Sequence, residues 1–356
     1  MEQGITKEQS KMLQGLAILM MLYHHLFSTP EALGIPYKSL LSFGSVNVEL
    51  RIAWFFKICV GIYAFVSGYG LCRSFKNEFS KDKSILETLK SDYKIVLKKL
   101  LNLYLAFWLV FIIFMAIGFI FFNKAFVFKE FILNFLGISN SYNGAWWYMY
   151  QYLKMVLLLP VFDVLISVYK AKKDRIVHII ALLAVILGSI CLILINKALF
   201  NSIIDYFQPA YYLCFLMGFI IARFKLYELF YKLLGKNIMY ILGVLGFIAV
   251  IAARIKIAKD ASSAGLDFIF VPVFVYGFLV IVDCLFKRVG KLFSFFGKYS
   301  TFIWLTHVFF YDHYAKKLVM ATHFSTGIYL TLVIMSLITA IILSYIFSNL
   351  LKIFKK

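Results

Sequence analysis

The chain is poor in charged residues and in proline. Asp, Glu, Lys and Arg make up 15% of its 356 residues, against about 25% in an ordinary soluble protein, and 63% of the residues are hydrophobic. A soluble domain of this composition lacks the polar side chains that its surface requires, which excludes a soluble globular enzyme and a disordered chain. The remaining class is a polytopic helical membrane protein.

Cysteine is also sparse and has no metal-binding spacing. The chain has five cysteines, all in or beside apolar runs, with no CxxC pair and no Cys/His pattern of the zinc type. This excludes a secreted disulfide scaffold and predicts that no metal is bound, so we interpret the cysteines as small buried residues. The first apolar run lacks the small residues of a cleavage site, and we expect it to be retained.

Acidic residues are scarce beside basic ones, with 17 Asp and Glu against 37 Lys and Arg and a net charge of +20. In a soluble protein this excess would suggest a nucleic-acid partner, whereas in a membrane protein it indicates which loops face the cytoplasm. Ten apolar runs have spanning length. They lie at residues 12–28, 53–72, 100–122, 145–168, 177–195, 206–222, 238–253, 268–286, 300–315 and 327–351.

The distribution of basic residues supports this count. The two termini and the even-numbered connections hold 25 of them, and the odd-numbered connections hold 10. We therefore predict an all-α, multi-pass protein of about ten transmembrane helices with both termini in the cytoplasm. Residues 1–356 are expected to form one membrane domain without an appended soluble domain. Its basic loops are expected to contact membrane lipids, not nucleic acid.

The longest connection, residues 73–99, is basic and has a helical apolar stripe. Ile85, Leu89, Tyr93 and Val96 follow one another at spacings of four, four and three. This pattern predicts an amphipathic helix that lies on the inner membrane surface, either as a lipid anchor or with a functional role. Arg73, Lys98 and Lys99 lie near its ends, where they can bind either lipid headgroups or the phosphates of a cytoplasmic cofactor.

Several polar side chains fall within the predicted spans, where they are costly unless they face the bundle interior. Gln14 and His25 are 11 residues apart and therefore share one helix face, about 16 Å apart along the axis. His24 is adjacent, and the sequence leaves open which histidine faces inward. A buried histidine can transfer a proton at physiological pH, or it can be a packed side chain with a structural hydrogen bond.

Three later segments carry further polar candidates. Ser67 lies among small residues at the end of the second run, where helices or a ligand can approach closely. Gln151 and Lys154 share a face below Trp147, and Lys154 is either functional or reaches the interface with its long side chain. His307 lies near the middle of the ninth span and is either functional or a packed, hydrogen-bonded side chain.

Together these segments resemble the acyltransferase-3 family of integral-membrane acyltransferases. The similar stretches are Gln14 to His25, Phe65 to Tyr69, Trp147 and Tyr148 followed by Pro160, and Ser300 to His307. They occur in the family's order, and ten helices is the number that the resemblance implies. The chain departs from the pattern where Gln14 replaces an arginine and Asn102 replaces the second arginine of an Arg-x-x-Arg motif. Lys11, one turn before Gln14, can serve instead.

The resemblance implies an acyltransferase, specifically an O-acetyltransferase of a bacterial plasma membrane. It would transfer acetyl from cytoplasmic acetyl-CoA to a surface polysaccharide, such as capsule or exopolysaccharide, or to its lipid-linked precursor. Polysaccharide-assembly proteins are further expected partners. The implied roles are catalysis by His25, as general base or acyl carrier, and by His307; acetyl-CoA binding by Lys11, Gln14, Ser67, Arg73, Lys98 and Lys99; and acceptor binding by Trp147, Tyr148, Gln151 and Lys154.

The alternative is a transporter or flippase for a lipid-linked glycan. Ten helices with central polar residues suit transport equally well on physical grounds. That function predicts matching halves with helices broken by glycine or proline. Of the five prolines, only Pro160, Pro209 and Pro272 lie near the predicted spans, and they show no symmetry. We therefore favour the enzyme.

Overall fold

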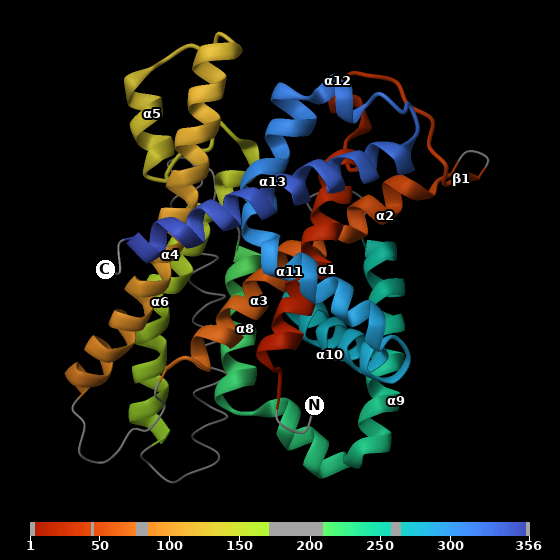
Figure 1. Ribbon diagram of the computed structural model, residues 1–356. Coiled ribbons are helices and arrows are strands. Elements are labelled where there is room, and N and C mark those ends of the chain that lie inside the picture. Colours follow the sequence, from red (N-terminus) through yellow and green to blue (C-terminus); the bar gives the residue numbers. More distant parts are fainter. Residues whose placement is uncertain (1–3, 44–45, 76–84, 171–208, 258–264, 354–356) are drawn as a thin grey trace.

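The computed structural model describes residues 4–43, 46–75, 85–170, 209–257 and 265–353. Within these ranges the secondary structure is helical apart from one hairpin of two two-residue strands and an isolated bridge between Lys38 and Phe324 (Figure 1). The first half comprises α1 (Lys7–Phe27), η1 (Pro30–Leu33), β1 (Ser42–Phe43), β2 (Val46–Asn47), α2 (Val48–Phe56), α3 (Ile58–Cys72), α4 (Ile85–Phe121), α5 (Phe128–Phe135), η2 (Gly144–Trp146) and α6 (Trp147–Lys170). The second comprises α8 (Pro209–Arg223), α9 (Leu226–Ile257), α10 (Asp267–Leu285), α11 (Lys287–Val308), the π-helical η3 (Phe309–Tyr314), α12 (Lys316–Val319) and α13 (Ser325–Ile353).

The all-helical, membrane-type architecture agrees with the prediction. Nine of the ten apolar runs coincide with helices of the described residues, and the run at 177–195 lies outside them. Within the part of the chain that the structure describes, five helical segments are both long and apolar enough to cross a bilayer: Val48–Cys72, Ile85–Phe121, Leu226–Ile257, Asp267–Leu285 and Ser325–Ile353. The count of ten spans and the orientation of the termini stay predictions.

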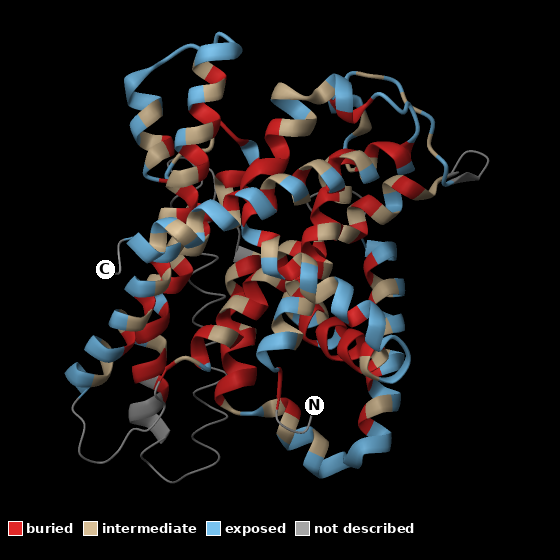
Figure 2. Cartoon of the chain, viewed as in Figure 1, coloured by how far each residue is buried: buried red, intermediate tan, exposed pale blue. Residues whose placement is uncertain are grey.

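Helix α1 lies in the middle of the bundle, and its start follows from its sequence. Thr6 and Gln9 form a capping box, in which each side chain accepts a hydrogen bond from the other residue's backbone N–H, at 3.1 and 2.9 Å. The helix contacts α2, α3, α11 and α13. Buried residues gather on α1, α3 and α8, whereas α9 and α13 expose apolar side chains (Figure 2). Such a surface is expected where helices face lipid.

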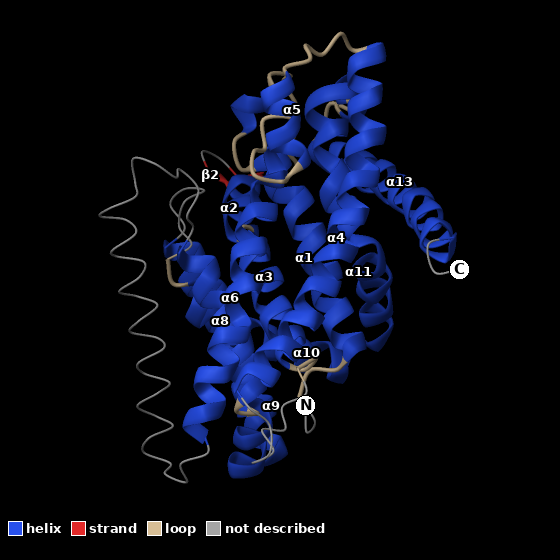
Figure 3. Cartoon of the chain, turned by 90° about the vertical axis from the view of Figure 1, so that its left-hand side faces the viewer, coloured by secondary structure: helices blue, strands red, loops and turns tan. Residues whose placement is uncertain are grey.

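Helices α3 and α8 are parallel and nearly touch through their backbones, and Gly61 further up α3 meets Cys214 of α8. Gly68 faces the carbonyl of Phe215, and Gly218 faces the carbonyl of Phe65 so closely that a Cβ at either glycine would overlap the carbonyl oxygen. Small residues allow this approach between membrane helices. Figure 3 shows α1, α3 and α8 running roughly alongside one another, with α13 slanting away.

Three predicted segments differ from the observed structure. The run at 53–72 is interrupted at Lys57, between α2 and α3. The predicted surface helix after residue 84 is instead the first part of the 37-residue α4. The end of its stripe packs on the bundle: Ile85 is exposed, but Val96 is buried, and the Tyr93 hydroxyl donates to the Leu157 carbonyl of α6 at 3.1 Å. The run at 300–315 begins earlier, within α11, and ends in the π-helical η3.

A buried ion pair holds the break between α2 and α3. Arg254 of α9 binds Asp267 of α10 with two hydrogen bonds, from Nε to Oδ1 at 2.8 Å and from Nη2 to Oδ2 at 3.0 Å. Its Nη1 donates to the carbonyls of Trp54 and Phe55, at 3.0 and 2.7 Å. These carbonyls lie in the last turn of α2, where a helix lacks backbone N–H donors for its carbonyl oxygens. The guanidinium group supplies such donors.

Candidate active-site cavity

Two parallel helices, α1 and α11, position the central histidines. Gly15 faces the Phe293 carbonyl and Gly297 faces the Lys11 carbonyl, again too closely for a Cβ. Ten residues further along each helix, about 15 Å, stand His25 and His307. Their ring centroids are 5.0 Å apart, with an interplanar angle of 81°. The close glycine contact and equal spacing therefore bring the two histidines together at one level of the bundle.

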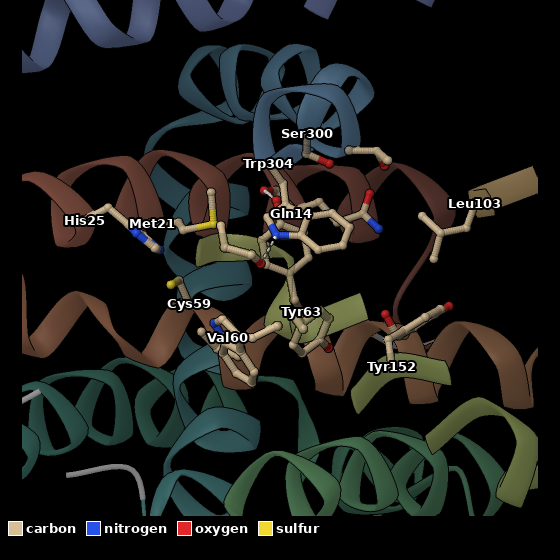
Figure 4. Close-up of a pocket in the computed structure, with 15 residues that line it drawn as sticks. Gln14, Met21, His25, Cys59, Val60, Tyr63, Leu103, Tyr152, Ser300 and Trp304 are labelled. Atoms are coloured by element: carbon tan, nitrogen blue, oxygen red, sulfur yellow. Dashed lines mark hydrogen bonds between the residues drawn. The ribbon is translucent and has the colours of Figure 1, made fainter. Parts of the chain in front are cut away.

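A cavity of about 200 Å³ opens beside this pair. It is lined by Gln14, Met21, His25, Cys59, Val60, Tyr63, Ser67, Leu103, Ala145, Trp147, Tyr148, Tyr152, Ser300, Thr301 and Trp304. His25, Met21 and Cys59 lie toward one end, with Leu103 and Tyr152 toward the other (Figure 4). None of these lining residues is Asp, Glu, Lys or Arg, so the cavity suits an uncharged group, with hydroxyl and amide side chains to hold it.

The two adjacent histidines of α1 have different environments. His24 Nδ1 is 2.7 Å from the carbonyl oxygen of Ala53 in α2, and a carbonyl only accepts, so this nitrogen donates. His25 lines the cavity, and its Nδ1 is 3.3 Å from the hydroxyl of Tyr311 in η3. Of the two, His25 is thus the histidine that can meet a ligand.

His307 is fully buried, and the protonation of its ring follows from its contacts. Its Nδ1 is 2.9 Å from the Trp304 carbonyl oxygen and 3.2 Å from that of Ile303. Since both partners only accept, Nδ1 carries the proton and the Nε2 of the neutral ring is an acceptor. This Nε2 is buried and has no hydrogen-bond partner among the described residues.

The loop before α6 is held against α11 one turn before His307. The Trp146 indole N–H and the Asn143 amide both donate to the Leu305 carbonyl, at 3.1 and 3.3 Å. In return the Trp304 indole N–H donates to the Ala145 carbonyl at 3.1 Å. These three bonds fix the start of α6, and with it Trp147, beside the cavity.

Some of the predicted site residues reach the cavity and others do not. Gln14, Ser67, Trp147 and Tyr148 line it together with His25, which fits the shared face predicted for Gln14 and His25. The two remaining residues of the predicted acceptor group lie elsewhere. Gln151 is fully buried outside the lining, and the Lys154 ammonium is 4.3 Å from the centroid of the Tyr150 ring.

The predicted basic residues lie outside the cavity. Lys99 is half-buried and donates to the Ser74 hydroxyl at 2.7 Å, one helical turn from Leu103 at the cavity end. Arg73 and Lys98 are exposed nearby in sequence, at the end of α3 and in α4. Lys11 lines a separate depression of about 340 Å³, between α1 and α11, together with Lys291 and Lys298.

Sequence reasoning missed several lining residues that follow a simple pattern. Cys59 and Tyr63 precede Ser67 at spacings of four along α3, and Tyr152 follows Tyr148 by four along α6. Each set shares one helix face, and this spacing was the available signal. Tyr311 follows His307 by the same spacing of four, and the two rings stack, although Tyr311 lies in the π-helical η3.

The helical bundle, its apolar surface and the histidine-lined cavity define an integral-membrane protein with a candidate ligand site among its helices. A family model described as an acyltransferase domain matches residues 10–349, so the chain belongs to the acyltransferase-3 family. No curated protein and no solved structure matches the chain. Family membership supports the function of a membrane acyltransferase.

Proposed function

We propose that this protein is an O-acyltransferase of a bacterial plasma membrane. It transfers an acyl group, acetyl by preference, from cytoplasmic acyl-CoA to a hydroxyl of a surface polysaccharide or its lipid-linked precursor. The observation that carries the proposal is the uncharged cavity that extends beside α1 from Gln14 to His25. With the N-terminus in the cytoplasm, Gln14 lies near the donor side and His25 lies further toward the outside.

The cavity composition determines where the donor would bind. Because no Lys or Arg lines it, CoA phosphates would stay outside, beside Arg73, Lys98 and Lys99, while the uncharged thioester arm enters. Leu103 at the cavity end is one turn from Lys99, so the basic group and the cavity are joined along α4. Gln14, Ser67 and Tyr152 offer hydrogen bonds to the amides of that arm.

The proposed step uses His25 as general base. The acceptor oxygen bonds to the acyl carbon while His25 takes its proton, and the carbon–sulfur bond breaks. The sulfur of CoA leaves as thiolate and receives a proton from the histidine, so the imidazole returns to its neutral form. Trp147, Tyr148 and Trp304 give the cavity the aromatic faces on which a sugar ring can rest.

The test is turnover of labelled acetyl-CoA by the purified protein in detergent, with and without the surface polysaccharide of the producing organism. We expect free CoA to appear together with label in the glycan, and the His25→Ala variant to lose at least about 100-fold of this rate. Full activity of the folded variant would overturn the role of His25. Glycan binding with intact thioester would instead indicate a transporter.

A further inference from the structure

The cavity histidine is contacted by a tyrosine from a different helix. The hydroxyl of Tyr311, in η3, is 3.3 Å from His25 Nδ1, a length found for catalytic hydrogen bonds before substrate is bound. The rings of Tyr311 and His25 have centroids 6.3 Å apart. Tyr311 follows the cavity wall of α11 in sequence but does not line the cavity itself.

Tyr311 reaches this position from η3, the π-helical segment that directly follows α11. It comes four residues after His307, so the two side chains share one face of this continuous helical stretch. The Tyr311 ring stacks on His307, with centroids 6.0 Å apart and planes at 29°. His25 therefore packs against both rings, Tyr311 and His307, that project from one continuous stretch of chain.

His307 cannot orient His25 through its own proton. The Nδ1 proton of His307 is used by the carbonyls of its own helix, and Nε2 has no proton to give in the neutral ring. Among the described residues, the hydroxyl of Tyr311 is the hydrogen-bond partner of the His25 side chain. Once Nδ1 is bound there, Nε2, on the opposite edge of the ring, is left for the cavity.

We propose that Tyr311 is a positioning residue, whose hydroxyl oxygen accepts a hydrogen bond from His25 Nδ1–H, so that the unprotonated Nε2 is presented to the reacting groups. The inference rests on the proposed acyl transfer for its kinetic consequence, while the hydrogen bond itself can be measured without activity. A general base must lie within hydrogen-bond reach of its proton, and a small misplacement costs up to about 100-fold in rate. Tyr311 supplies this alignment and exchanges no atom with substrate.

The kinetic test compares Tyr311→Phe with Tyr314→Phe. Both variants remove one hydroxyl from η3, but Tyr314 donates to the Phe114 carbonyl at 2.8 Å and not to a histidine. We expect Tyr311→Phe to lower kcat roughly 10- to 100-fold, with KM for acetyl-CoA nearly unchanged and the pH midpoint of kcat displaced. Tyr314→Phe should keep the wild-type pH profile. Equal losses in both variants, or an unchanged Tyr311→Phe enzyme, would overturn the proposal.

A spectroscopic test separates this inference from the proposed function. The chain has six histidines, so ring ¹⁵N signals in detergent can be assigned to His25 by their absence from His25→Ala. Tyr311→Phe should shift the Nδ1 signal of His25, and Tyr314→Phe should leave it in place. An unmoved Nδ1 signal would refute the hydrogen bond. If wild-type protein turns over no thioester, the acyltransferase proposal fails, while the ring signals still decide the contact with Tyr311.

Discussion

His24 and His25 are adjacent on α1, but their side chains point in different directions and have different roles. Successive side chains of an α-helix point about 100° apart. His24 is thereby directed to the Ala53 carbonyl of α2, and His25 to the cavity and Tyr311. One histidine therefore ties two helices together, while the other is available to a ligand.

The His24→Ala variant should separate these tasks. It removes one side-chain hydrogen bond to the backbone, worth about 1 kcal/mol of stability, but leaves the cavity lining unchanged. We expect a lower unfolding temperature in detergent and thioester turnover within about threefold of wild type. Loss of turnover in a folded His24→Ala protein, with activity kept in His25→Ala, would reverse the assignment.

At the scale of elements, glycine determines how closely the helices pack. Gly15 and Gly297 let the backbones of α1 and α11 meet, and this contact places His25 level with His307. Gly70 in α3 shows the opposite case, since a Cβ there would meet no atom within 4 Å. Glycine therefore matters at these positions through contact between helices.

Adding a single methyl group should reveal this difference. Gly15→Ala forces a Cβ onto the Phe293 carbonyl, so α1 and α11 must separate, at a cost of about 1–3 kcal/mol or more. We expect Gly15→Ala to lower the unfolding temperature in detergent and to reduce turnover, because the histidine pair moves apart. Gly70→Ala is the matched control and should unfold at or above the wild-type temperature. Similar behaviour of the two variants would contradict the packing argument.

At the scale of the whole molecule, Arg254 connects three parts of the chain that are distant in sequence. It joins α9 to Asp267 of α10 and to the backbone end of α2. Because the pair is buried, removing one partner alone leaves an uncompensated charge among apolar side chains.

Arg254→Met should therefore destabilise the protein by about 3–5 kcal/mol, whereas the double variant Arg254→Met with Asp267→Leu should recover much of that loss. Thermal unfolding of the purified variants in detergent measures the difference. If the double variant were no more stable than Arg254→Met, the cost would lie in the lost bonds to α2 and not in the unpaired carboxylate.

The predicted orientation is also a property of the whole chain. With 25 basic residues on one predicted side and 10 on the other, the C-terminus should be cytoplasmic. Green fluorescent protein fused after Lys356 should fluoresce, and alkaline phosphatase inserted at Lys124 should be active, since each reporter works on one side of the membrane. The opposite result at both positions would place the proposed donor site on the outer side of the membrane and contradict the predicted orientation.

The sequence predicted those parts of the site that lie on a single helix. Gln14 and His25 both line the cavity because 11 residues make about three complete helical turns. This relation can be predicted without knowing which helices pack around α1. Gln151 and Lys154 share the face of Trp147, but only Trp147 of these three lines the cavity. The rotation of a helix about its axis depends on the helices packed around it, which a single stripe does not specify.

By itself, the sequence determined the class of the protein, its helical segments and its family resemblance, because composition and periodicity are local properties of the chain. The tertiary structure decided which histidine faces the cavity, that Tyr311 contacts this histidine, and that Arg254 pairs with Asp267. Each of these depends on contacts between helices far apart in the chain, set by close glycine contacts and buried hydrogen bonds. These contacts exist only once the bundle has packed.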